Sequence, residues 1–116
     1  MHTALIAFDS DQLNTILQKM LDAFGFQTVT TQSIEELSLF FKENKSGLVL
    51  TDWTLEKKQT LPLFSELLPE QRVLFVSAEK TPEKVILALQ SGICEYIMKP
   101  FDNDILQSKL SMIGLL

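Results

Sequence analysis

Two kinds of segment alternate along the chain, and each has its own spacing of apolar residues. Short runs rich in aliphatic and β-branched residues alternate with longer runs in which apolar residues recur at helical spacing. The short runs predict strands at 4–8, 27–30, 48–51, 73–76 and 95–98. Several of these runs are almost wholly apolar, which is typical of strands covered by helices on both faces. The alternation therefore predicts an α/β fold with a parallel sheet.

Helical spacing and end signals predict a helix after each of these strands. In the first helix the apolar positions 13, 16, 17, 20 and 21 form one stripe, and Gly25 suits its left-handed end. Ser33 and Glu36 form a capping box that begins the second helix. Thr81 and Pro82 begin the fourth helix, and Gly92 lies beyond its end. The last helix begins at Asp102 or Asp104. Pro62 must lie in the first turn of the third helix, which we expect over 60–68.

Five such strand–helix units predict the topology of the sheet. With right-handed crossovers they give an open, doubly wound sheet of the flavodoxin-like type, with strand order 2-1-3-4-5. A length of 116 residues and a hydrophobic content of 46% suit one domain, over 1–116. Sheets of this kind place their functional sites outside the carboxyl ends of the strands. The residues that follow each strand are therefore the ones to inspect.

Charge and hydropathy exclude several classes of function. The net charge of −5 argues against binding to nucleic acid, because such surfaces need clustered Lys and Arg to replace counterions. No apolar stretch approaches the roughly 20 residues of a membrane span, so we expect no membrane insertion. We expect a soluble protein of the cytoplasm.

Polar side chains follow four of the predicted strands. They are Asp9, Ser10 and Asp11 after the first, Asp52 after the third, Ser77 after the fourth and Lys99 after the fifth. Gathered carboxylates repel each other unless a cation lies among them, and hard oxygen ligands suit Mg²⁺. A carboxylate placed there can attack a phosphoryl group, while a lysine neutralises the phosphate charge and a serine hydroxyl hydrogen-bonds it. The pattern predicts phosphoryl transfer.

Each of these residues also has an ordinary structural explanation when it is taken singly. Asp9 or Asp11 can cap the first helix, and Asp52 can begin a turn. Ser77 can cap a helix, and Lys99 can be a solvated loop residue. Their coincidence at one predicted edge of the sheet favours the functional interpretation.

Four segments of the chain match a known family. They are 5–11 (LIAFDSD), 48–53 (LVLTDW), 73–78 (VLFVSA) and 95–101 (EYIMKPF), and Lys followed by Pro after the fifth strand is the most specific. With these motifs the sequence resembles the receiver domains of two-component response regulators along essentially its whole length. It is most similar to small free-standing regulators of the chemotaxis type.

The resemblance implies a role for each matching residue. Asp52 would accept a phosphoryl group from a histidine kinase or phosphotransfer protein, and the chain would be a phosphoacceptor switch, not an enzyme. The other implied roles are Mg²⁺ binding by Asp9, Asp52 and the Thr54 backbone, phosphate contact and switching by Ser77 and Lys99, and an inward-turning aromatic side chain at Tyr96.

Two departures from the family pattern concern the metal site. Ser10 stands where a second adjacent acid is usual, so we expect weak Mg²⁺ binding, with Asp11 as a further candidate ligand. The loop over 54–60 lacks the usual Pro and Gly, which puts its geometry in question.

These departures leave two alternative functions open. The first is an interaction module of the same fold that works without phosphorylation. The second is a haloacid dehalogenase-type phosphatase, because Asp9 and Asp11 form a D-x-D motif. Such phosphatases need further acids after another strand, and only a terminal helix is expected after Lys99.

A run of apolar residues over 85–89 suggests a surface for partners. If Val85, Ala88 and Leu89 face the sheet, Ile86 must point toward solvent. We expect Ile86 and Leu87, with Tyr96 nearby, to contact a downstream protein target or a second copy of the chain. The alternative is that Leu87 packs against a neighbouring helix and Ile86 is an isolated exposed residue.

Overall fold

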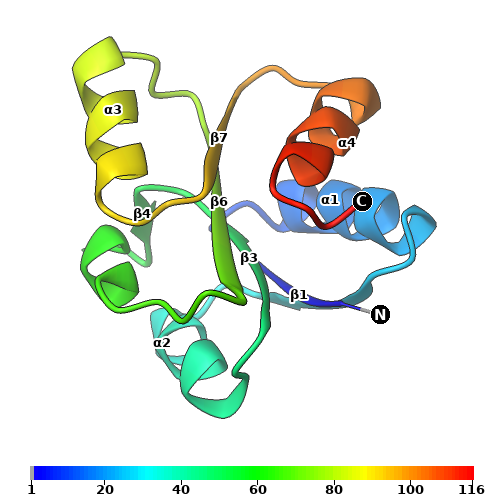
Figure 1. Cartoon of the computed structure of the whole chain (residues 1–116), viewed down its shortest axis with the longest axis horizontal. Coiled ribbons are helices and arrows are strands. Elements are labelled where there is room, and N and C mark those ends of the chain that lie inside the picture. Colours follow the sequence, from blue (N-terminus) through cyan, green and yellow to red (C-terminus); the bar gives the residue numbers. More distant parts are fainter. Residues whose placement is uncertain (1) are drawn as a thin grey trace.

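The predicted strands pair into one parallel sheet in the computed structural model, which describes residues 2–116 (Figure 1). The strands are β1 (Thr3–Ala7), β2 (Gln27–Thr31), β3 (Gly47–Thr51), β6 (Gln71–Ser77) and β7 (Glu95–Met98). They lie in the order β2-β1-β3-β6-β7, and every neighbouring pair is parallel. This confirms the predicted doubly wound topology.

The helices begin and end where local sequence signals place them. They are α1 (Asp11–Ala23), α2 (Ile34–Glu43), α3 (Pro82–Gln90) and α4 (Asn103–Met112). The hydroxyl of Ser33 accepts a hydrogen bond from the Glu36 amide, and Asp102 caps α4 by accepting from the Ile105 amide. Thr81 precedes α3 as expected, but its side chain makes no capping hydrogen bond.

The predicted third helix over 60–68 is wrong. The chain after β3 first forms an antiparallel hairpin of β4 (Thr54–Leu55) and β5 (Lys58–Gln59). Only one turn of 3₁₀ helix follows, η1 (Leu61–Phe64). Phe64 and Leu55 are buried against the sheet, so this short segment covers the face that a longer helix would cover.

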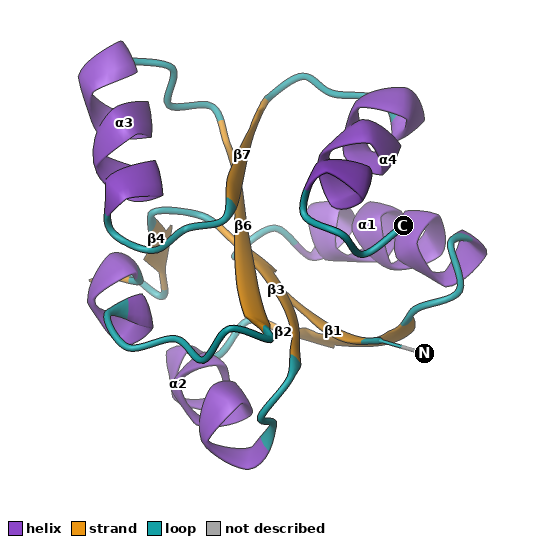
Figure 2. Ribbon diagram, in the orientation of Figure 1, coloured by secondary structure: helices purple, strands orange, loops and turns teal. Residues whose placement is uncertain are grey.

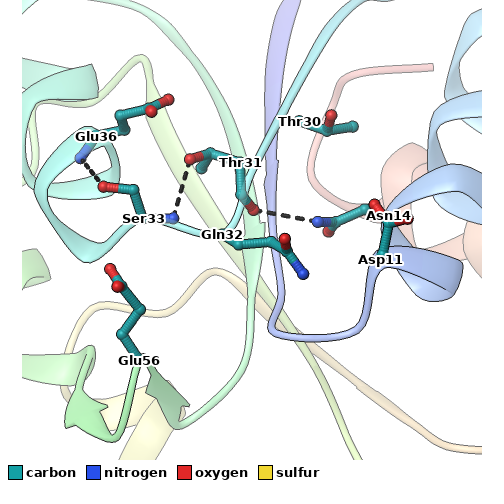
Figure 3. A pocket seen from close by; sticks show the side chains of 8 residues that line it. All are labelled: Asp11, Asn14, Thr30, Thr31, Gln32, Ser33, Glu36 and Glu56. Atoms are coloured by element: carbon teal, nitrogen blue, oxygen red, sulfur yellow. Dashed lines mark hydrogen bonds between the residues drawn. The ribbon is translucent and has the colours of Figure 1, made fainter.

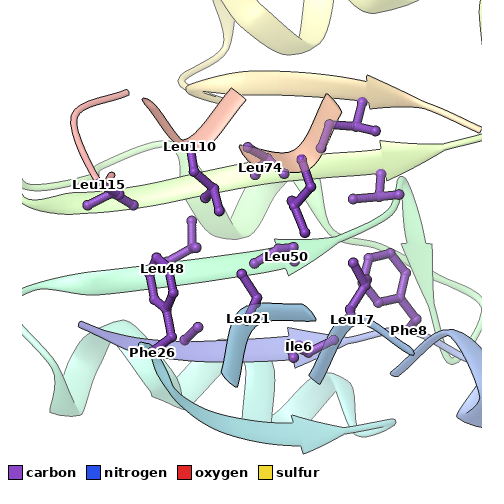
Figure 4. Packing of buried hydrophobic residues seen from close by; sticks show 14 residues of the cluster. Ile6, Phe8, Leu17, Leu21, Phe26, Leu48, Leu50, Leu74, Leu110 and Leu115 are labelled. Atoms are coloured by element: carbon purple, nitrogen blue, oxygen red, sulfur yellow. The ribbon is translucent and has the colours of Figure 1, made fainter. Parts of the chain in front are cut away.

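Helices lie on both faces of the sheet, as Figure 2 shows. Alternate residues of β1 belong to different cores: Ala4 and Ile6 face α1 and α4, whereas Leu5 and Ala7 face α2 and α3. The first core also holds Leu17, Leu50 and Leu110 (Figure 4). Within residues 2–116 no helix has the length and hydropathy needed to cross a bilayer.

Candidate functional site

A hollow of about 190 Å³ lies at the carboxyl ends of the strands. Its lining comprises Phe8, Asp9, Ser10, Leu13, Asp52, Thr54 and Lys99. These residues follow β1, β3 and β7, which are adjacent or near neighbours in the sheet although they are distant in sequence. The structure therefore brings together four of the strand-end residues, Asp9, Ser10, Asp52 and Lys99, whose functional roles stay predictions.

Asp52 is fixed by the strand that precedes it. All residues of β3 are buried, so the strand end has little freedom to move. One carboxylate oxygen, Oδ1, accepts a hydrogen bond from the Trp53 amide at 2.7 Å, and the Asp52 carbonyl accepts one from the Thr60 hydroxyl. Within residues 2–116 the other carboxylate oxygen accepts no hydrogen bond, and the residue is half-buried.

Asp9 is exposed and takes part in two hydrogen bonds. Its Oδ1 atom accepts from the Glu56 amide at 2.9 Å, and its carbonyl accepts from the Gln32 side chain at 2.6 Å. The first bond joins the end of β1 to the β4–β5 hairpin. Asp9 thus shares one hollow with Asp52 while its carboxylate is bonded to the hairpin.

Ser10, and not Asp9 or Asp11, caps α1. Its hydroxyl accepts a hydrogen bond from the Leu13 amide at 3.1 Å. Asp11 lies at the first position of the helix and lines a different hollow, together with Glu36 and Glu56 (Figure 3). The expectation that Asp11 replaces the missing acid beside Asp52 gains no support. Within residues 2–116 no three His, Cys, Asp or Glu side chains lie close enough to hold a metal ion.

Lys99 and Ser77 approach the site from β7 and β6. The half-buried Lys99 lines the hollow, with its Nζ atom 5.9 Å from the centre of the Phe8 ring. Ser77 is buried, its hydroxyl accepts from the Glu79 amide at 3.0 Å, and its carbonyl accepts from the Lys99 amide. Ser77 is not part of the lining of the hollow, and its hydroxyl caps a turn rather than a helix.

Tyr96 lies inside the protein with both hydrogen-bonding functions of its hydroxyl used. Only 4% of the residue is exposed. The hydroxyl donates to the Glu79 carbonyl and accepts from Trp53 Nε1, both at 2.8 Å. We expected Tyr96 near a partner surface, but in this conformation its side chain is buried, bonded to Trp53 and packed against Phe75.

Glu79, whose carbonyl accepts the hydrogen bond of the Tyr96 hydroxyl, has a carboxyl group with a lowered pKa. Hydrogen bonds from Thr81 and the charge of Lys84 hold the pKa of Glu79 below its ordinary value. One of these bonds runs from the Thr81 amide to the Glu79 carboxylate at 3.0 Å. Glu79 therefore remains ionised at neutral pH and closes the turn that leads into α3.

Apolar side chains are exposed on α3. Ile86 and Leu87 are 53% and 50% exposed, as expected for Ile86, so half of Leu87 is also open to solvent. We expected Leu89 to face the sheet. That expectation is wrong, because Leu89 is 41% exposed. Ile93, beyond the end of the helix, is buried in the core that Ala88 also enters.

Two residues that hold the site were missed in the sequence. The buried Asn14 side chain bonds the amide and carbonyl of Phe8 and the carbonyl of Thr31. It thereby fixes the chain just before Asp9. Its signal was a polar residue inside the apolar stripe of α1. The second is Glu56, which left no recognisable signal because its role depends on the hairpin.

These features define a class of protein, a doubly wound α/β domain with two carboxylates and a lysine at one sheet edge. The chain belongs to the response regulator receiver domain family, whose model matches residues 4–111. This family acts in phosphorelay signal transduction, and its members are in general phosphoacceptor switches.

Individual relatives agree with the family assignment. A chemotaxis protein CheY homolog of Campylobacter jejuni is 27% identical over 113 residues, covering 91% of this chain and 87% of the relative. Chemotaxis protein CheY-3 of Vibrio cholerae is 29% identical over 116 residues, covering 94% and 88%. Among solved structures, the beryllofluoride-activated NtrC4 receiver domain dimer has a TM-score of 0.86 at 17% identity, covering 97% and 96%. Neither the family match nor these proteins support the phosphatase alternative.

Proposed function

We propose that the chain is a phosphorylatable receiver in which Asp52 accepts a phosphoryl group from a histidine kinase or phosphotransfer protein. Phosphorylation then changes its contacts with a downstream protein. The observation that carries the proposal is the meeting of Asp9, Asp52 and Lys99 in one hollow, although they come from three separate strand ends.

In this proposal each side chain of the site has a part in the reaction. The Asp52 carboxylate oxygen that is not bonded to the Trp53 amide attacks the phosphorus, and an acyl phosphate forms as the imidazole of the donor leaves. The Lys99 ammonium lines the same hollow and pairs with a phosphoryl oxygen. The Ser77 hydroxyl accepts from Glu79 and keeps its own hydrogen to donate to a phosphoryl oxygen.

The residues of the hollow fit a hydrated Mg²⁺ ion in part. Mg²⁺ is commonly held by one or two carboxylates while it keeps several water ligands. Asp9, Asp52 and Thr54 line the hollow, and in this proposal they would supply the protein oxygens. The ion would neutralise charge on the phosphoryl oxygens. Because the Ser10 hydroxyl is engaged at the start of α1 and Asp11 lies elsewhere, we expect weak binding.

The test is phosphorylation by acetyl phosphate with and without Mg²⁺, measured by intact mass and peptide mapping. Wild type should gain one Mg²⁺-dependent phosphoryl group, Asp52→Asn should gain none, and Asp11→Asn should behave as wild type. Label that persists in Asp52→Asn, or that maps to Asp9, would overturn the assignment.

One observation favours a second function, an interaction module that needs no phosphate. The Asp9 carboxylate already bonds the hairpin amide, and a hydroxyl stands in the place of the second acid. Under this alternative no label forms on wild type under any Mg²⁺ concentration.

For the partner, we propose a downstream protein that binds the exposed apolar side chains of α3. A second copy of the chain is the competing occupant. The relative named above as a receiver dimer supports the second copy only by analogy of fold.

A further inference from the structure

The β4–β5 hairpin turns through two residues in an unfavourable backbone conformation. Glu56 has φ 49° and Lys57 has φ 63°, and together they join Leu55 to Lys58. Two-residue turns with positive φ at both positions normally use Asn and Gly, because a Cβ atom is disfavoured there. Only two residue pairs form the hairpin ladder, so the turn needs support from outside the hairpin.

Glu56 supplies that support with a hydrogen bond from each end of the residue. Its amide donates to Asp9 Oδ1 at 2.9 Å, and its carboxylate Oε1 accepts from the Ile34 amide at 2.7 Å. Ile34 is the first residue of α2, where a carboxylate is favoured by the unpaired amides and the helix dipole. Figure 3 shows the Glu56 side chain directed from the hairpin toward the start of α2.

From these two bonds we infer that Glu56 is a positioning residue for Asp9. The carboxylate anchors the hairpin to α2, and the anchored hairpin presents the Glu56 amide to Asp9 Oδ1. Asp9 lines the hollow together with Asp52, and with Oδ1 held in this way the second Asp9 oxygen is the one we assign to the ion. The inference rests on the proposed function, in which Asp9 is a ligand of Mg²⁺.

A bond of this kind has a measurable effect on a metal site. A hydrogen bond to a metal-binding side chain fixes the orientation of that side chain. Its loss commonly weakens metal binding by about 10–100-fold. The opposite arrangement is one in which the Glu56 amide occupies an oxygen that the ion needs. In that case loss of the anchor would tighten Mg²⁺ binding, so the two arrangements differ in the sign of the effect.

The experiment compares Glu56→Ala, Glu56→Gln and the control Lys57→Ala in the full chain. Lys57 is a neighbour that is equally exposed and has the same left-handed conformation. Mg²⁺ affinity is measured by calorimetry and by the fluorescence of Trp53, the single tryptophan. Amide hydrogen exchange at Ile34 and Glu56 reports the anchor itself, without any metal.

We expect Glu56→Ala to exchange faster at both amides and to bind Mg²⁺ about tenfold more weakly or worse. Glu56→Gln keeps an oxygen acceptor and should lie close to wild type, as should Lys57→Ala. Unchanged exchange, or unchanged or tighter Mg²⁺ binding in Glu56→Ala, would overturn the inference while wild type still responds to the ion. A wild type that neither binds Mg²⁺ nor labels at Asp52 would overturn the proposed function, and the inference with it.

Discussion

At the scale of single residues, Trp53 connects Asp52, the phosphoacceptor that we propose, with Tyr96. Trp53 follows Asp52 directly, and its indole Nε1 donates to the Tyr96 hydroxyl, which in turn donates to the Glu79 carbonyl. Lys84 of α3 lies 5.7 Å from the Trp53 ring centre. An outward movement of Tyr96 would break both hydroxyl bonds, so Trp53 holds Tyr96 inside.

Trp53→Phe should release Tyr96 while it preserves an aromatic ring against Phe75. The loss of one partly buried hydrogen bond should lower the free energy of unfolding by about 0.5–1.5 kcal/mol. Because Tyr96 is the single tyrosine, ¹⁹F NMR of 3-fluorotyrosine-labelled protein should show greater solvent exposure. A double-mutant cycle with Tyr96→Phe is the control, and strict additivity of the two changes would contradict the predicted contact.

Ser10→Asp should strengthen Mg²⁺ binding. Asp is as good an N-cap as Ser, so the start of α1 is preserved while a charged oxygen enters the hollow that Asp9 and Asp52 line. We expect the affinity to rise about tenfold, equivalent to about 1.4 kcal/mol, in a calorimetric titration. Asp11→Asn should leave the affinity of the wild type unchanged, and equal affinities of Ser10→Asp and wild type would refute the prediction.

The site residues also show where reasoning from sequence stops at this scale. Strand ends could be predicted from local patterns, and parallel strands necessarily bring them to one edge, so the meeting of Asp9, Asp52 and Lys99 was predictable. The direction of each side chain could not be predicted from the sequence. Asp11 is two residues from Asp9 yet lines another hollow, because the first turn of α1 rotates it away.

At the scale of elements, the sequence predicted those segments whose signals are local. The capping hydrogen bonds of Ser33 and Asp102 each join residues within one helical turn, and both are present as expected. The segment after Asp52 was predicted wrongly because its hairpin depends on distant partners. Asp9 and Ile34 lie far from Glu56 in sequence, and no local pattern at 54–60 reveals contacts with them.

The α3 helix presents apolar side chains that the fold does not need. Ala88 is buried and Val85 half-buried, whereas Ile86 and Leu87 each remain about half exposed. Replacing an exposed side chain changes stability little, within roughly 0.5 kcal/mol. A change in binding after such a replacement therefore reports on contact rather than on folding.

Ile86→Lys should weaken binding to the partner without unfolding the protein. A charge placed in an apolar contact must lose its hydration, so partner recovery or self-association should fall at least tenfold. Met112→Lys on α4 is the matched control, since Met112 is 67% exposed on another helix. Sedimentation and pull-down measurements in which both variants equal wild type would identify Ile86 as an incidentally exposed residue.

At the scale of the whole molecule, the site exists only when the sheet is complete. β3 lies between β1 and β6, and β7 pairs with β6, so Asp9, Asp52 and Lys99 meet through four paired strands. Cores on both faces hold these strands in register. The unfolded chain has no such site, so a ligand of the hollow binds the native state alone.

This linkage predicts that a phosphoryl analogue stabilises the fold. Beryllofluoride with Mg²⁺ should bind Asp52 in the native state only, and at about 100 times its dissociation constant it would add about 2.7 kcal/mol to the free energy of unfolding. For a domain of this size the melting temperature should rise by roughly 10 °C in differential scanning calorimetry. Asp52→Asn removes the charged oxygen that the beryllium requires, so its melting temperature should not respond to beryllofluoride. Mg²⁺ alone should shift wild type only slightly, because Ser10 stands in place of a further acid beside Asp9 and Asp52 and we propose weak binding. An equal rise in wild type and Asp52→Asn would mean that the analogue binds elsewhere, and the hollow would then not be the phosphoacceptor site.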